Sequence, residues 1–144
     1  MMRYSRSALF LLAFGAVSSL STPVLAEEIS IVKEDHSVEM VSAKELKRML
    51  LGKSKRWKNG DKVVVGTLQS GVTHDRFIRK YAGKTPKQFT NYWRKMVFSG
   101  KGAMPKAFAT EEAMASFVSE RNGALGYVDD AQSYSGTKEL RIHK

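Results

Sequence analysis

Strand-like and helix-like segments alternate along this chain from residue 28 onward, and their order restricts the fold to one class. The segments Glu28–Lys33, Lys62–Leu68 and Gly123–Val128 are short and mostly apolar, which predicts strands. Glu139–Ile142 is a candidate for a last strand. Because helical segments of ordinary length separate the strands, we expect an α/β domain with parallel strand pairings.

Strong start signals mark three of the helices. Ser42 and Glu45 have the spacing of a capping box, and Gly52 supplies the stop signal of that helix. Thr85–Gln88 combines an N-cap threonine, proline at the first helical position and glutamine at the third, and Thr110 begins another helix. The side chains at helical spacing that we expect in the core are Leu46, Met49, Leu50, Phe89, Tyr92, Trp93, Met96, Val97, Met114, Phe117 and Val118. Trp57, beside an Asn-Gly turn, is predicted to pack that turn against the sheet.

The first 26 residues have the composition of a cleavable signal peptide. Arg3 and Arg6 precede a short apolar run, Ala8–Val17, and Val24–Ala26 places small or aliphatic residues at the cleavage site. The alternative is a membrane anchor, but a span needs about 20 apolar residues and serines interrupt this run earlier. We therefore expect cleavage after Ala26 and export to the periplasm, with no stable membrane insertion afterwards.

Removing 26 of the 144 residues leaves one domain of 118 residues, and removing two arginines from a formal charge of +10 leaves +8. This charge favours anionic partners such as phosphate-like solutes, acidic proteins or lipid headgroups. Nucleic acid fits poorly with export and with aromatic residues placed on helix faces. The chain has no cysteine, which excludes disulfides, thiolate chemistry and thiolate metal sites.

Several short pieces occur here in the order found in one family of binding proteins. They are the run from Ser42 to Gly60, then Ser70-Gly71, Phe77, Tyr92-Trp93, Phe98 to Gly102, Pro105 and Gly123 to Val128. In this order the chain resembles the phosphate-type periplasmic substrate-binding proteins of ABC transporters. The resemblance implies a type 2 periplasmic-binding-protein-like fold with a mixed sheet flanked by helices. A full clamp has two lobes, so residues 27–144 are expected to form a single lobe.

The polar loop after the second strand is the candidate binding site. Residues 69–73 lead into a predicted helix, Thr73–Tyr81, whose first amides and dipole favour an anion. The expected ligand-binding residues are Ser70, Gly71, Val72, Thr73 and Arg76. In the resembled family a Ser-Gly-Thr loop at this place holds phosphate. Val72 stands where the threonine is expected, and the arginine that precedes the family's loop has no clear counterpart.

A second interpretation of this loop is structural: Thr73 caps its own helix, and Ser70 and Gly71 only form a turn. His74 beside the loop is interpreted as a surface histidine. The histidines lack the spacing of a zinc pair and no nucleophile motif is present, so we expect no metal, no cofactor and no enzyme activity.

Two functions remain open from the sequence. The first is a periplasmic solute-binding protein for phosphate or a similar oxyanion. The second is a ligand-free accessory protein that dimerises or docks on an envelope protein. Its docking surface would be the basic stretch, which we define as Lys44, Lys47, Arg48, Lys53, Lys55, Arg56 and Lys58. These cations are equally consistent with a solvated helix face.

Overall fold

A computed structural model describes residues 27–130 and 132–144, so the predicted signal peptide, residues 1–26, lies outside the described residues. The strands are β1 (Glu28–Lys33), β2 (Met40–Ser42), β3 (Val64–Leu68), β4 (Lys106–Phe108), β5 (Ala124–Asp129), β6 (Thr137–Glu139) and β7 (Arg141–His143). The helices are α1 (Ala43–Leu50), α2 (Val72–Phe77), the π-helical turn η1 (Ile78–Ala82), α3 (Pro86–Phe98) and α4 (Glu111–Glu120).

Five of the strands form a mixed sheet in the order β4-β3-β5-β1-β6, and β2 pairs with β7 in a separate two-stranded sheet. β3 is parallel to both β4 and β5, as the strand–helix alternation predicts, whereas β1 runs antiparallel to β5 and β6. Among the described strands, the expectation of parallel pairings is therefore correct for β3 with its two neighbours and for β2 with β7, and wrong for β1. The class α/β, with a mixed sheet flanked by helices, is confirmed.

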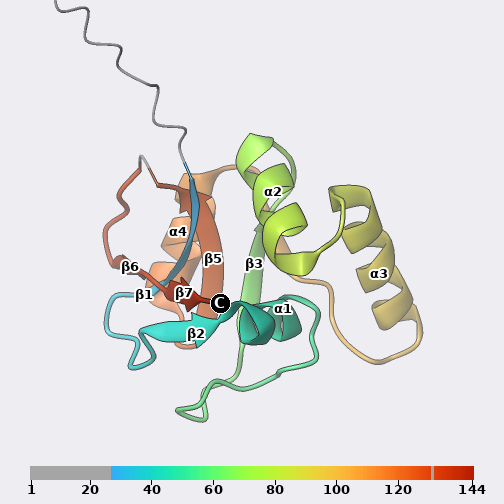
Figure 1. Cartoon of the computed structure of the whole chain (residues 1–144), viewed down its shortest axis with the longest axis horizontal. Helices are drawn as coiled ribbons and strands as arrows, with labels where there is room; N and C mark the ends of the chain where they lie inside the picture. The colour runs from blue at the N-terminus through green and yellow to red at the C-terminus, as the bar shows by residue number, and fades with distance from the viewer. Residues whose placement is uncertain (1–26, 131) are drawn as a thin grey trace, which may run out of the picture.

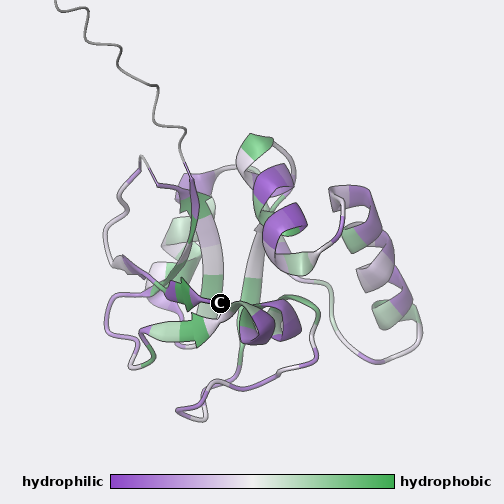
Figure 2. Cartoon of the chain, viewed as in Figure 1, coloured by the Kyte–Doolittle hydropathy of each residue, from purple (hydrophilic) through white to green (hydrophobic). Residues whose placement is uncertain are grey.

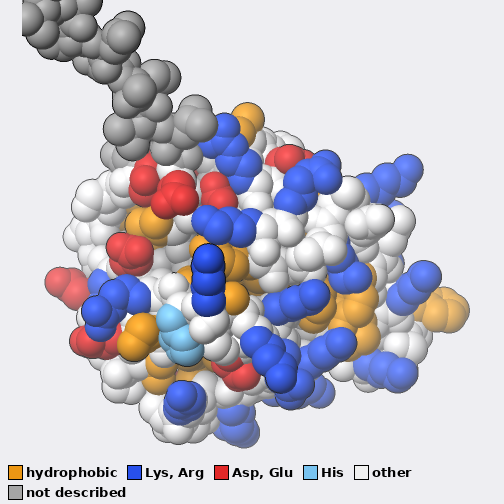
Figure 3. Space-filling model, in the orientation of Figure 1, with side chains coloured by type: hydrophobic (Ala, Val, Ile, Leu, Met, Phe, Trp, Pro, Cys, Tyr) orange, Lys and Arg blue, Asp and Glu red, His pale blue; other side chains and the backbone are white. Residues whose placement is uncertain are grey.

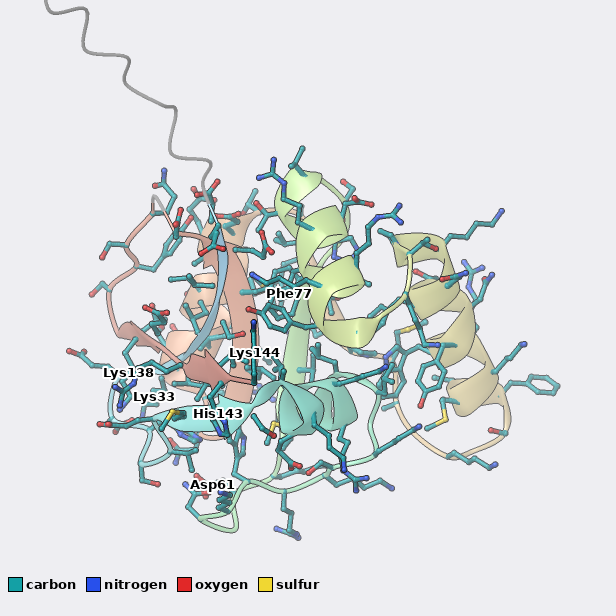
Figure 4. The ribbon with its side chains drawn as sticks, in the orientation of Figure 1. Lys33, Asp61, Phe77, Lys138, His143 and Lys144 are labelled. Carbon is teal, nitrogen blue, oxygen red and sulfur yellow. The ribbon has the colours of Figure 1, made fainter. Side chains whose placement is uncertain are left out.

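Helices cover the two faces of this sheet (Figure 1). α4 packs on one face, against Gly66 of β3 and Gly126 of β5, where a Cβ on Gly126 would lie 3.0 Å from Val118. The absence of side chains at these two glycines lets the helix approach the strands closely. On the opposite face, Phe77 of α2 stacks on Tyr127 of β5 with ring centroids 4.0 Å apart (Figure 4).

The predicted helix starts are present. Ser42 Oγ accepts the amide N–H of Glu45, and at α3 both hydrogen bonds of the Thr85–Gln88 capping box form. The helix predicted over residues 73–81 continues from α2 into the π-helical turn η1 and ends at Gly83, whose φ is +65°. Glu139–Ile142, predicted as one strand, is divided between β6 and β7 at the buried Leu140.

The predicted aromatic core is largely confirmed. Trp57, Phe89 and Trp93 are at most 5% exposed, and the indole N–H of Trp57 donates to the carbonyl of Gly123 (2.9 Å). Figure 2 shows hydrophobic residues in the central strands and hydrophilic residues along α2 and α3. Val97, also predicted in the core, is instead 45% exposed near the end of α3.

Candidate functional site

The candidate loop lies at the carboxyl end of β3, directly before α2. Leu68 ends the strand in the core, whereas Ser70, Gly71 and Val72 are exposed and Thr73 is half-buried. Gly71 is the N-cap residue with φ of +109°, a conformation that side-chain-bearing residues rarely adopt. Apart from its chain neighbours, no heavy atom of the described residues lies within 4 Å of the position that a Cβ would occupy on Gly71, so this backbone faces open space.

Two amides of the segment are bonded within the protein. The N–H of Gln69 donates to the carbonyl of Phe108 (2.8 Å), and the N–H of Asp75 donates to the carbonyl of Gly71 (3.0 Å). For the amides of residues 70–73, the described part of the chain supplies no backbone or side-chain acceptor. Val72 and Thr73 are the first residues of α2, and their amides have no partner inside the helix, so both donors are available to solvent or to a ligand.

The structure changes the interpretation of Thr73. Helix α2 begins at Val72 with Gly71 as its N-cap, and no side chain caps it. The interpretation of Thr73 as the cap of its own helix is therefore wrong, because Thr73 is already the second helical residue. The hydroxyls of Ser70 and Thr73 have no capping bond at this helix start.

Charges around the loop are partly compensated. The guanidinium of Arg79 lies 3.0 Å from the carboxylate of Asp75, one turn away on the same helix. This ion pair offsets a negative charge that would oppose an anion at the start of α2. Arg76 is exposed, four residues after Val72, and therefore lies on the same side of the helix as the loop residue Val72.

His74 is buried beneath the loop rather than exposed, which corrects the interpretation of a surface histidine. It is 6% exposed, and its Nδ1 is hydrogen-bonded to the hydroxyl of Tyr127. That hydroxyl also accepts the N–H of Leu68 (2.9 Å), so a single oxygen contacts both Leu68 and His74. The bond network therefore ties the end of β3 to the start of α2.

The electrostatics of this pair favour its neutral form. Burial lowers the pKa of His74 below its ordinary value, and the nearby carboxylate of Asp75 opposes the shift only in part. Burial also raises the pKa of the Tyr127 hydroxyl well above its ordinary value. A signal for the burial of His74 was present in the sequence, because His74, Phe77, Ile78 and Tyr81 follow the spacing of one helix face.

The departures from the resembled loop are visible in the geometry. Val72, which stands in place of a hydroxyl donor, is 65% exposed. Gly66, Thr67 and Leu68, the positions before the loop, are all buried in β3, and none supplies a cation. Charge at this site therefore comes from Arg76 and from backbone amides.

The basic stretch forms a second surface. All seven of its cations are exposed, and Arg48 is the only one of them for which the described residues show an ion pair, with Glu45 at 3.9 Å. In Figure 3, Lys and Arg side chains spread over much of the visible face, whereas Asp and Glu gather mainly on one side.

Residues 27–130 and 132–144 show no cluster of three or more histidine or carboxylate side chains that could hold a metal ion. Within the same residues, no helix combines the length and apolar character needed to cross a bilayer.

Comparison with known proteins identifies the fold. No protein-family model and no curated protein sequence matches the chain. Solved structures do match: an ABC-type phosphate transport receptor from Vibrio cholerae has a TM-score of 0.62 at 14% identity, covering 83% of this chain and 47% of that one. A phosphate ABC transporter substrate-binding protein from Clostridium perfringens, solved with bound phosphate, has a TM-score of 0.60 at 16% identity, covering 81% and 45%.

A phosphate-binding-type protein from Planctomyces limnophilus matches with a TM-score of 0.59 at 15% identity, covering 83% of this chain and 42% of its own. The chain thus has the fold of about half of a phosphate ABC transporter substrate-binding protein and spans less than half the length of these structures. The names of these proteins describe phosphate receptors or binding proteins rather than enzymes.

Proposed function

We propose that this chain, which shares its fold with half of a phosphate-binding transport receptor, is a periplasmic solute-binding lobe for phosphate or a similar oxyanion. The observation that carries the proposal is the exposed turn at residues 70–73. Its amides have no acceptor in the described residues, and the space beside Gly71 is open. The fold is shared with a protein solved with bound phosphate, which supports the same ligand class here.

All the groups that would bind the oxyanion are hydrogen-bond donors. The amides of residues 70–73 and the hydroxyls of Ser70 and Thr73 would donate to the oxyanion, and the guanidinium of Arg76 would supply charge and two further N–H groups. The neutral His74–Tyr127 pair would hold the loop without adding charge. Because no group in this set acts as a nucleophile, the proposal is binding without catalysis.

A single lobe limits the affinity. We propose residues 27–144 as one lobe, with residues 1–26 as its signal peptide. One lobe contacts one face of the ligand, so the other face stays hydrated and gains nothing from the low dielectric of a closed cleft. We therefore expect dissociation constants between micromolar and millimolar, about 4–8 kcal/mol of binding free energy.

Titration calorimetry on protein purified from the periplasm of an expressing bacterium tests the proposal. We expect heat with phosphate, a graded response to sulfate, and none with the uncharged phosphate ester trimethyl phosphate. The double variant Ser70→Ala/Thr73→Val and the variant Arg76→Gln should each weaken binding about tenfold, whereas Arg94→Gln on the exposed face of α3 should not. Absence of heat at millimolar phosphate and sulfate would refute the proposal.

A ligand-free accessory protein is the second candidate, because the basic stretch is exposed and forms a single ion pair with the residues that the structure describes. Its partner would be an acidic envelope protein or a second copy of the chain. The triple variant Lys53→Glu/Lys55→Glu/Arg56→Glu should abolish capture of the partner, or dissociate a dimer in analytical ultracentrifugation. Phosphate binding that persists in this variant would favour the first function.

A further inference from the structure

A groove lies at the other end of β3 from the candidate loop. Its volume is about 460 Å³, and residues 63–65 at the start of β3 form part of its wall. Val65, the last β3 residue in this wall, lies three residues before Leu68 at the carboxyl end, about 10 Å away at about 3.3 Å per strand residue. The groove is therefore a separate feature, which the sequence patterns did not indicate.

Apolar side chains from five segments form the floor of this groove: α1, β3, α3, the loop before β4, and α4. Trp93 of α3 is 5% exposed, and its indole N–H donates to the carbonyl of Leu50 (3.2 Å), so the polar atom is already bonded. Glycines pack directly on this ring: a Cβ on Gly52 would lie 2.6 Å from it and one on Gly102 3.1 Å. Further apolar surface comes from Phe117 and Met104, and Met104 is 47% exposed.

Cations surround this floor, and its lining among residues 27–130 and 132–144 contains no Asp or Glu. The five are Lys55, Lys62, Lys101, Lys106 and Arg121. In the described part of the chain, none of these five forms an ion pair with a carboxylate.

Two of these cations point over the floor rather than away from it. Lys106 Nζ lies 5.3 Å from the centroid of the Phe117 ring, and the Arg121 guanidinium lies 4.8 Å from it. Positive charge therefore sits at the apolar surface itself, where an anionic group would be attracted.

We propose that this groove binds a single-chain amphiphilic carboxylate, with its apolar chain on the Trp93–Phe117 floor and its head group among the five cations. The volume lies within the range of pockets that enclose small organic ligands, which are mostly apolar with a few convergent polar groups. An inorganic anion would leave the floor in water, and an uncharged amphiphile would leave the cations without a partner. The carboxylate satisfies both.

Decanoate is the probe, kept below its micelle concentration, with the purified full protein. Binding is followed by calorimetry and by two-dimensional amide NMR, in which the indole N–H signal of Trp93 reports on the groove directly. We expect shifts at Trp93 and at the amides of residues 101–104 and Lys106, and at least tenfold weaker binding for the uncharged amphiphile octyl glucoside. Inorganic phosphate should not shift the Trp93 signal, which separates this site from the loop site.

Two matched double variants test the role of the cations. Lys62→Glu/Lys101→Glu reverses two exposed charges of the groove, and Lys87→Glu/Arg94→Glu reverses two exposed charges on α3 outside it. The first should weaken decanoate binding at least tenfold and the second less than twofold. Met104→Ser, an exposed change in the floor, should also weaken binding.

Equal losses in the two double variants would overturn the proposal, because they would indicate attraction by net charge alone. Equal affinity for octyl glucoside would also overturn it, as would decanoate shifts confined to the loop at residues 69–76. An acidic peptide without an apolar chain that displaces decanoate at equal concentration would assign the groove to a protein partner instead. A failure of phosphate to bind at the loop would not affect this test of decanoate binding in the groove.

Discussion

Tyr127→Phe is the substitution that best tests how the candidate loop is held. Tyr127 is fully buried in β5, and its hydroxyl accepts the N–H of Leu68 and is hydrogen-bonded to His74 Nδ1. Phenylalanine keeps the ring and its stacking on Phe77, and removes the one oxygen that serves both partners. The variant therefore isolates two hydrogen bonds without opening a large cavity.

The expected loss follows from the two groups left without partners. A buried donor or acceptor that loses its partner costs about 1–3 kcal/mol. The N–H of Leu68 and His74 Nδ1 face the same lost oxygen, so their penalties share one site and do not add in full. We expect a loss of about 2–4 kcal/mol in the free energy of unfolding, which is large against the 5–15 kcal/mol of a typical domain.

Urea unfolding monitored by tryptophan fluorescence measures this loss, with Trp57 and Trp93 as reporters. Tyr92→Phe is the control, because the hydroxyl of the half-buried Tyr92 makes one bond, to the carbonyl of Leu51 directly after α1 (2.6 Å). We expect the control to lose about 1 kcal/mol. A Tyr127→Phe variant that loses less than its control would refute the reasoning that this hydroxyl holds the loop.

Three further predictions concern stability. Burial holds the pKa of His74 below the value of about 6.5 in the unfolded chain, so as the pH falls the unfolded state binds a proton first and the free energy of unfolding should decrease below pH 6.5. His74→Asn should reduce this pH dependence, measured as urea midpoints from about pH 7 to about pH 5. Gly52→Ala should lower the free energy of unfolding by about 2–4 kcal/mol, because an alanine would be strained at φ +69° and its Cβ would clash with Trp93. The control Gly60→Ala, at φ +91° but in open space, should cost about 1 kcal/mol in the same assay. Gly71→Ala should cost about 1–3 kcal/mol, because φ +109° with ψ 170° is a conformation almost exclusive to glycine, and it should weaken phosphate binding in calorimetry; unchanged affinity would argue against amide donors at this turn.

Much of the local structure follows from residues close together in sequence. The caps at Ser42 and Thr85 formed as predicted because each joins groups only three residues apart. Gly83 ended its helix for the same kind of reason, since only the local backbone conformation matters there. Such contacts form in almost any tertiary context.

Other elements could not be predicted from local pattern. β2 and β4 are three residues long, and each exists through hydrogen bonds to a strand distant in sequence. The antiparallel direction of β1 is set by its neighbours β5 and β6, which come from the end of the chain. No periodicity within β1 carries that information.

The sequence by itself determined the α/β class, the helix starts after Ser42, Thr85 and Thr110, and the position of an exposed Ser-Gly turn after β3, because these depend on hydrophobic alternation and on contacts within a few residues. The tertiary structure decided that His74 lies under the turn, since its partner Tyr127 is 53 residues away. It also brought Lys55, Lys106 and Arg121 together around an apolar floor. Charged and aromatic side chains from distant segments can act at one site only when packing of the core places them side by side.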